Sequence, residues 1–166
     1  MKFKTTPYHF DLLKDEERLS AFYEAIKELS TSQELAYDLG CGSGILSFFL
    51  NSYFKEIIAI EQDFKASRCA KENLKSFKNI EVVNEDVLKY DFSKKCDLIV
   101  CEMLDTALID EEEVPVLNHA RNYLKENGKI IPHGIINTIE LARLERDYIH
   151  YCLLYTSPSP RDRTRS

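Results

Sequence analysis

The stretch LAYDLGCGSG, residues 35–44, decides the fold of this chain. LAYDL predicts a short buried strand, and the glycines that follow it predict a tight turn into a helix. Glycine lets a backbone approach a ligand closely, and ligands of such folds bind beyond the carboxyl ends of the strands. A lone glycine-rich turn is also compatible with a plain strand-to-helix connection, so its surroundings have to be considered with it.

Strand-like and helix-like segments alternate on both sides of this turn. Strands are predicted for LAYDL, EIIAIE, IEVV, CDLIVCEM and GKII, and helices for residues 11–30, 45–53, 64–77 and 114–125. This alternation indicates a parallel sheet covered by helices on both faces. The apolar runs LIV and IIAI agree, because central parallel strands are buried on both sides. We therefore expect an α/β, Rossmann-like fold.

The composition is that of an ordinary globular protein, with 44% hydrophobic and 30% charged residues among 166. No apolar run approaches the roughly 20 residues of a membrane span, and the N-terminus lacks a secretory signal. The five cysteines have neither a CxxC pair nor a ligand-like spacing to histidine, which predicts reduced thiols in a cytoplasmic protein and no metal site. A net charge of −6 argues against a general nucleic-acid clamp.

Acidic residues stand at the ends of three predicted strands. Asp38 comes just before the glycine turn, where it can meet a cationic amino group. Glu61 ends the next strand about 20 residues after the glycines, a position from which a carboxylate accepts hydrogen bonds from both ribose hydroxyls. Asp86, with its neighbour Val87, follows the third strand and suits the exocyclic amine of an adenine. Each acid alone has a solvated loop position as its alternative, but together they indicate an adenosyl ligand.

A dinucleotide site is the main alternative for the turn, but its usual pattern is GxGxxG without a preceding acid. This chain has GxGxG with Asp38 two residues ahead, which would repel a pyrophosphate but suits a sulfonium cofactor with an amino-acid tail. Over residues 34–131, the turn and its acids resemble class I methyltransferases, which use S-adenosyl-L-methionine. The resemblance implies this cofactor, bound by Asp38, Gly40, Gly42, Gly44, Glu61, Asp86 and Val87.

The end of the fourth strand indicates which methyltransferases are most similar. The sequence CEML, residues 101–104, lacks the (N/D)PP(Y/F) turn of enzymes that methylate base amines in nucleic acids. Glu111 follows nine residues after Glu102, which resembles the double-glutamate loop that holds the substrate guanidinium in protein arginine methyltransferases. LLKDEER, residues 12–18, resembles that family's helix motif, whose arginine, here Arg18, contacts the cofactor carboxylate. The resemblance covers residues 8–151 and looks most like short archaeal and bacterial relatives.

This second resemblance implies an S-adenosylmethionine-dependent N-methyltransferase that acts on arginine in a protein or peptide, with Glu102 and Glu111 as catalytic residues. It also implies a homodimer of the full-length protein. The chain departs from the family after Glu102, where MLDT replaces Trp-Met-Gly-Tyr. RNA or a small amine is therefore the alternative methyl acceptor, and a non-catalytic cofactor-binding relative is the alternative outside the enzymes.

Two of the predicted site residues also have structural alternatives. Glu111 stands just before a predicted helix, where an acid favours the positive end of the helix dipole. Arg18 has Asp15 and Asp11 close by in the sequence, so pairing on an exposed helix face is its alternative role.

The composition changes after Tyr151. CLLYTSPSPRD, residues 152–162, matches the translation of a transposase adapter used in DNA sequencing, and a disordered tail is the alternative. We therefore expect an N-terminal helical segment at 1–33, a Rossmann-like cofactor-binding domain at 34–138, the start of a truncated β-rich part at 139–151, and a non-native segment at 152–166.

Overall fold

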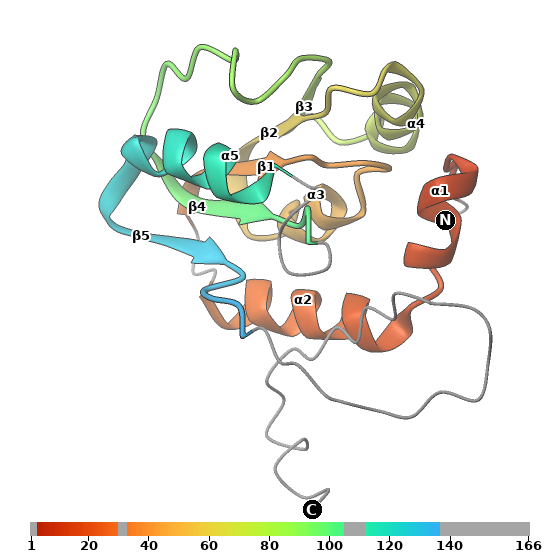
Figure 1. Ribbon diagram of the computed structural model, residues 1–166, viewed down its shortest axis with the longest axis horizontal. Coiled ribbons are helices and arrows are strands. Elements are labelled where there is room, and N and C mark those ends of the chain that lie inside the picture. Colours follow the sequence, from red (N-terminus) through yellow and green to blue (C-terminus); the bar gives the residue numbers. More distant parts are fainter. Residues whose placement is uncertain (1–2, 30–32, 105–111, 137–166) are drawn as a thin grey trace, which may run out of the picture.

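The computed structural model describes residues 3–29, 33–104 and 112–136 (Figure 1). Along the chain the elements are α1 (Pro7–Leu12), α2 (Glu16–Leu29), β1 (Gln33–Leu39), α3 (Ile45–Leu50), β2 (Phe54–Ile60), α4 (Phe64–Leu74), β3 (Ile80–Val83), β4 (Cys96–Cys101), α5 (Glu113–Ala120), the 3-10 turn η2 (Arg121–Tyr123) and β5 (Leu124–Ile131). The predicted alternation of strands and helices is confirmed. The segments predicted at 139–151 and 152–166 lie outside the described residues, so the domain borders stay predictions.

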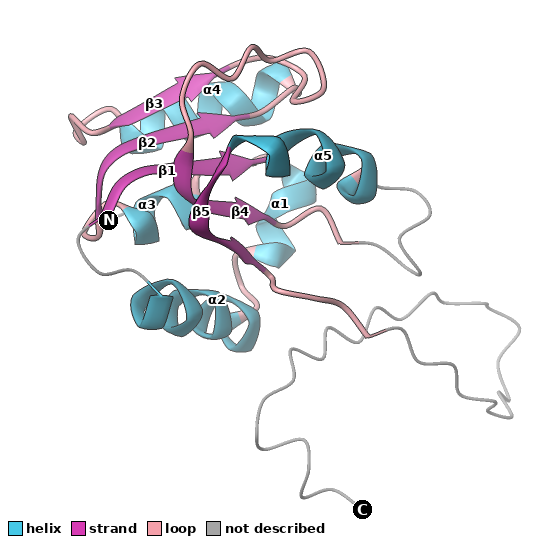
Figure 2. Ribbon diagram, turned by 90° about the vertical axis from the view of Figure 1, so that its left-hand side faces the viewer, coloured by secondary structure: helices cyan, strands magenta, loops and turns pink. Residues whose placement is uncertain are grey.

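The five strands form one parallel sheet in the order β3-β2-β1-β4-β5 (Figure 2). This is the α/β, Rossmann-like arrangement that the sequence predicts. At the carboxyl end of β1, Leu39 is in register with Ile60 of β2 and with Cys101 of β4. The residues that follow these three strands therefore meet at one edge of the sheet, which is where ligands of parallel sheets bind.

Side chains alternate between the two faces of the sheet, and both faces are buried. One face carries Ala36, Ile57, Leu98 and Val100, which pack with Ile26 of α2 and with Leu46 and Leu50 of α3. The other carries Tyr37, Leu39, Ile58, Ile60 and Ile99, which pack with Val116 and Ala120 of α5. In Figure 1, α2 accordingly lies below the sheet, and α5 crosses in front of it. Burial on both sides explains the continuous apolar runs of the strands.

The helix predicted over 11–30 is wrong in its bounds, because the structure has two helices there. Thr6 caps the first, with Pro7 at its first position, and α1 ends at Leu12. The carboxylate of Asp15 then accepts a hydrogen bond from the backbone N–H of Arg18 at 2.9 Å, which starts α2. The apolar spacing runs through both helices, so it could not reveal a break that is set by local caps. None of the helices in the described ranges is long and apolar enough to cross a membrane.

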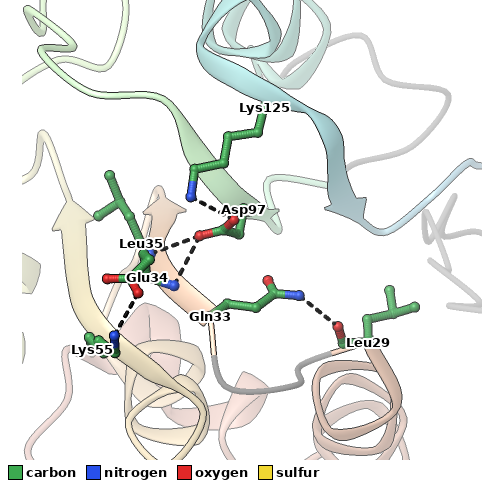
Figure 3. Close-up of polar contacts among 7 residues, drawn as sticks. All are labelled: Leu29, Gln33, Glu34, Leu35, Lys55, Asp97 and Lys125. Carbon is green, nitrogen blue, oxygen red and sulfur yellow. Dashed lines mark hydrogen bonds and ion pairs between the residues drawn. The ribbon is translucent and has the colours of Figure 1, made fainter.

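Polar contacts join the amino ends of the strands at the edge opposite to the glycine turn (Figure 3). Asp97 of β4 accepts hydrogen bonds from the backbone N–H groups of Glu34 and Leu35 at 3.0 and 3.1 Å, and from Lys125 Nζ at 2.7 Å. Burial by itself raises the pKa of Asp97, but these hydrogen bonds outweigh it and lower the pKa. Asp97 thus ties β1, β4 and β5 together as an ionised carboxylate, away from the edge that carries the predicted site.

Candidate functional site

A cleft of about 970 Å³ opens at the carboxyl edge of the sheet, between α1, the glycine turn and the start of α5. Most of the residues predicted from the sequence line it, namely Arg18, Gly40, Gly42, Glu61, Asp86, Val87 and Glu102. Asp38 and Gly44 are not among its lining residues, and Glu111 lies outside the described part of the chain. The cofactor contacts predicted for Asp38 and Gly44 and the substrate contact predicted for Glu111 therefore stay predictions.

Glu61 connects the end of β2 to the glycine turn. Its Oε2 accepts a hydrogen bond from the N–H of Gly42 at 2.8 Å, and its Oε1 accepts one from the N–H of Asp63 at 2.7 Å. Each carboxylate oxygen has a second lone pair, so the two oxygens retain the capacity to accept from a pair of hydroxyls. The geometry is thus compatible with the ribose contact predicted for Glu61.

Gly42 is a position that only glycine suits. Its φ is +54°, in the left-handed region, and a Cβ added there would lie 2.9 Å from Cδ2 and Nε2 of His9. The imidazole of His9 therefore lies directly against the glycine turn, and α1 forms one wall of the cleft. The sequence predicted a close approach of this turn to a ligand, which stays a prediction, and did not predict the histidine found there.

Asp38 is buried beside the turn and has an incomplete set of hydrogen bonds. Its Oδ2 accepts a hydrogen bond from Ser47 Oγ at 2.5 Å, whereas its Oδ1 has no hydrogen-bond partner among the described residues. Burial raises the pKa of Asp38 to about 7. A buried carboxylate oxygen without a donor is costly, and it suggests a donor that comes from outside the chain. The residues at this end of the site therefore fit the ammonium group of an amino-acid tail.

Asp86 stands on the cleft wall after β3. Its carboxylate is 2.9 Å from Lys89 Nζ and accepts a hydrogen bond from the N–H of Leu88 at 2.9 Å. These contacts, the Lys89 hydrogen bond foremost, lower the pKa of Asp86. Val87 beside it is buried in the core under α5. Asp86 is thus an ionised hydrogen-bond acceptor at the position predicted for the adenine amine.

Arg18 and Glu102 form an ion pair across the cleft, with side chains that are only 8% and 10% exposed. Arg18 also donates from Nη1 to the backbone oxygen of Leu12 at 3.2 Å. The exposed pairing considered for Arg18 is wrong, because its side chain is buried and Asp15 accepts from its backbone N–H. The pair joins the residue predicted to hold the cofactor carboxylate to the residue predicted to hold the substrate.

The sequence did not predict several residues that line the cleft. His9 and Leu12 of α1 and Leu13, which caps its end, line the cleft, and their i, i+3, i+4 spacing is the signal that could have found them. Glu112 lines the cleft where α5 begins, and Glu113 in the first turn of α5 is buried, with 1% exposed.

A family described as a methyltransferase domain matches residues 36–128 of the chain. An uncharacterised protein of Methanothermobacter thermautotrophicus is 52% identical over 96% of this chain. The chain spans 63% of that relative's length. A ribosomal protein L11 methyltransferase of Thermoanaerobacter pseudethanolicus is 32% identical over 69% of this chain and 36% of its own. Protein arginine N-methyltransferase 2 of Xenopus tropicalis is 27% identical over 94% of this chain and 38% of its own.

Two solved structures share the fold. The Trypanosoma brucei PRMT1 enzyme–prozyme complex with AdoHcy superimposes with a TM-score of 0.69 at 24% identity, over 76% of this chain and 42% of that chain. Arabidopsis thaliana protein arginine methyltransferase 10 superimposes with a TM-score of 0.67 at 26% identity, over 76% of this chain and 38% of that chain.

Proposed function

This chain belongs to the methyltransferase domain family, and from that premise we propose that the full-length protein is an S-adenosylmethionine-dependent N-methyltransferase that acts on arginine in a protein or peptide. The observation that carries the proposal is the position of Glu102. Its carboxylate lies in the same cleft as Glu61 and Asp86, at the end of β4, and is paired there with a cation. In the proposed complex Arg18 would bind the cofactor carboxylate instead, which would leave the carboxylate of Glu102 to hold the guanidinium of the substrate.

The cofactor would lie along the carboxyl edge of the sheet. Glu61 would accept from the ribose, Asp86 from the adenine amine, and the buried Oδ1 of Asp38 from the ammonium group. Arg18 would hold the carboxylate. When bound, the cofactor supplies a methyl group on a positively charged sulfur, so the residues of this chain mainly bind and orient the reacting groups.

The charges around the cleft favour a cationic methyl acceptor. Among the described residues, five acidic and two basic ones line it, namely Glu61, Asp63, Asp86, Glu102 and Glu112 against Arg18 and Lys65. Glu102, with Glu111 as its proposed second carboxylate, would hold the guanidinium and localise its charge on the nitrogens that do not attack. Similarity to two arginine methyltransferases supports this acceptor. Similarity to a ribosomal protein methyltransferase supports a protein acceptor without specifying arginine.

RNA and a small amine are the alternative acceptors, and a non-catalytic cofactor-binding protein is the alternative function. Methyl transfer assays with an arginine-containing peptide, a structured RNA and small amines separate the acceptors. A protein that binds S-adenosylhomocysteine but methylates none of these would support the non-catalytic alternative.

We expect Glu61→Ala to weaken S-adenosylhomocysteine binding at least tenfold. Hydrogen bonds to a charged group contribute roughly 1.5–3 kcal/mol each, and this substitution removes two from the ribose as well as the bond to Gly42. Calorimetric titration of the full-length protein measures the effect. The exposed acid Glu81 on β3 provides the control, since Glu81→Ala should leave the affinity unchanged. Unchanged affinity in Glu61→Ala would remove Glu61 from the site, and binding of NADH instead would contradict the cofactor.

Binding of S-adenosylhomocysteine should weaken as the pH falls below about 7. Burial raises the pKa of Asp38 to about 7, so below that pH the free protein holds a proton that an incoming ammonium group must displace. Affinity should therefore fall by up to tenfold for each pH unit below 7 and be constant above it. The free energy of unfolding of the ligand-free protein should have the reverse trend. It should fall as the pH rises from about 4 to 7, because the folded state binds the proton of Asp38 more tightly than the unfolded state does. In Asp38→Asn both pH dependences should disappear. If the affinity of this variant still falls below pH 7, Asp38 is not the source of the effect.

A further inference from the structure

Asn73 on α4 joins two segments that are distant in sequence. Its Oδ1 accepts a hydrogen bond from the N–H of Lys4 at 2.7 Å, and its Nδ2 donates to the backbone oxygen of Lys4 at 2.7 Å and to that of Ser43 at 2.9 Å. The side chain is 4% exposed. It therefore binds both backbone groups of one residue in the N-terminal arm, which we define as residues 3–6, and one backbone group of the glycine turn.

The N-terminal arm leads directly into the wall of the cleft. Thr6, its last residue, caps α1 by accepting a hydrogen bond from the N–H of His9, and its Oγ1 is 2.7 Å from His9 Nδ1. The ring of His9 lies against the glycine turn, because a Cβ added at Gly42 would be 2.9 Å from it. In Figure 1, α1 and α4 lie at the same end of the molecule. The position of the arm thus determines where α1 covers the glycine turn.

The other contacts of the arm are less specific than that of Asn73. Phe3 packs edge-to-face on Phe48 with ring centroids 5.6 Å apart, which holds the arm close but not in one register. Lys4 Nζ is 3.4 Å from the carboxylate of Glu72, an exposed pair that solvent and salt weaken. A buried amide, by contrast, satisfies a donor and an acceptor of the backbone at once, and removing it leaves these groups without partners.

We propose that Asn73 is a positioning residue for the cofactor cleft. It docks the N-terminal arm and the glycine turn on the same helix, and thereby holds α1 as the cover of the cleft. The proposal rests on the proposed function, since it takes the cleft as the cofactor site. An undocked arm leaves the turn uncovered, so the apparent affinity for the cofactor scales with the fraction of molecules in which the arm is docked.

Asn73→Ala and Asn79→Ala in the full-length protein form a matched pair that tests the proposal. Asn79 donates from Nδ2 to the backbone oxygens of Asn51 and Phe54, at 3.1 and 2.8 Å, at the opposite edge of the sheet. Both substitutions remove side-chain-to-backbone bonds and should lower the melting temperature. Only Asn73→Ala should raise the Kd for S-adenosylhomocysteine, by at least tenfold, which corresponds to about 1.4 kcal/mol.

Hydrogen exchange of the ligand-free protein supplies a readout that does not depend on the cofactor. Asn73→Ala should accelerate exchange of the Lys4 and His9 amides, and Asn79→Ala should not. Phe3→Ala serves as a second variant, because it loosens the arm without altering α4. It should also raise the Kd. In the double variant Phe3→Ala/Asn73→Ala, the change in binding free energy should be smaller than the sum of the two single changes.

Three results would overturn the positioning role. These are equal changes of Kd in Asn73→Ala and Asn79→Ala, unchanged exchange of the Lys4 amide in Asn73→Ala, and an unchanged Kd in a Phe3→Ala protein whose Lys4 amide exchanges faster. A wild-type protein that does not bind S-adenosylhomocysteine overturns the proposed function itself. A wild-type protein that binds it, with a Kd that Asn73→Ala leaves unaltered, overturns only the role of Asn73.

Discussion

Glu102→Gln should lower the rate of methyl transfer in the full-length enzyme by about two orders of magnitude or more, the usual effect of losing a preorganised electrostatic group. Glutamine keeps the shape of the side chain but removes the charge that would hold a cationic acceptor. It also weakens the buried ion pair with Arg18, so the stability of the variant is measured beside its rate. Cofactor affinity should change far less, because Glu61, Asp86 and Arg18, which are proposed to hold the cofactor, are unchanged. Single-turnover rates with an arginine-containing peptide, together with calorimetric Kd values for S-adenosylhomocysteine, separate the two effects.

The neighbouring glutamates make this test specific. Glu111→Gln should behave like Glu102→Gln if the two form a pair, and the double variant should be little worse than either single one. Glu112→Gln tests the register, since Glu112 lines the cleft. A large effect there in place of Glu111 would keep the pair but change its second member. The proposal is contradicted if Glu102→Gln retains most of its activity on every amine tried, or if its whole defect is lost cofactor binding.

Arg18→Met should destabilise the protein by about 3–5 kcal/mol, the typical cost of leaving one charge of a buried pair without its partner. The side chains of Arg18 and Glu102 are 8% and 10% exposed, so water cannot replace the lost guanidinium. Methionine retains much of the apolar stem of arginine, which limits the loss of packing. Urea unfolding of the full-length protein measures the change.

The double variant Arg18→Met/Glu102→Gln distinguishes electrostatics from packing. It removes both charges of this pair and should recover much of the lost stability, yet it should remain inactive because Glu102 is absent. Lys27→Met is a suitable control, because Lys27 pairs with Glu24 on an exposed face of α2 and should be near neutral. If Arg18→Met alone also leaves the free energy of unfolding nearly unchanged, the prediction is contradicted, and the ion pair contributes little to stability despite its burial.

The fold and the outline of the cleft could be predicted from the sequence because the signals are local. The runs IIAI and LIV identify strands buried on both faces, and the order of the elements then requires parallel pairing through covering helices. Gly42 has a positive φ and a histidine ring close to it, whereas the close approach predicted from the sequence was to a ligand and stays a prediction. Glu61 could be placed as well, because a residue that ends a parallel strand is carried to the ligand-binding edge whatever the packing details.

Only the tertiary structure decided which polar groups meet. Arg18 and Glu102 are 84 residues apart, and Asn73 is 69 residues from Lys4, so no periodicity links them. The break between α1 and α2 depends on local caps, which compete with a continuous apolar spacing. The lack of a hydrogen-bond donor to Oδ1 of Asp38 among the described residues depends on what packs around it. Local patterns determined the backbone path of this protein, because propensity and burial act within a few residues. The pairing of its buried charges and amides was decided by the packed chain, because the desolvation that makes such partners necessary exists only after distant segments have come together.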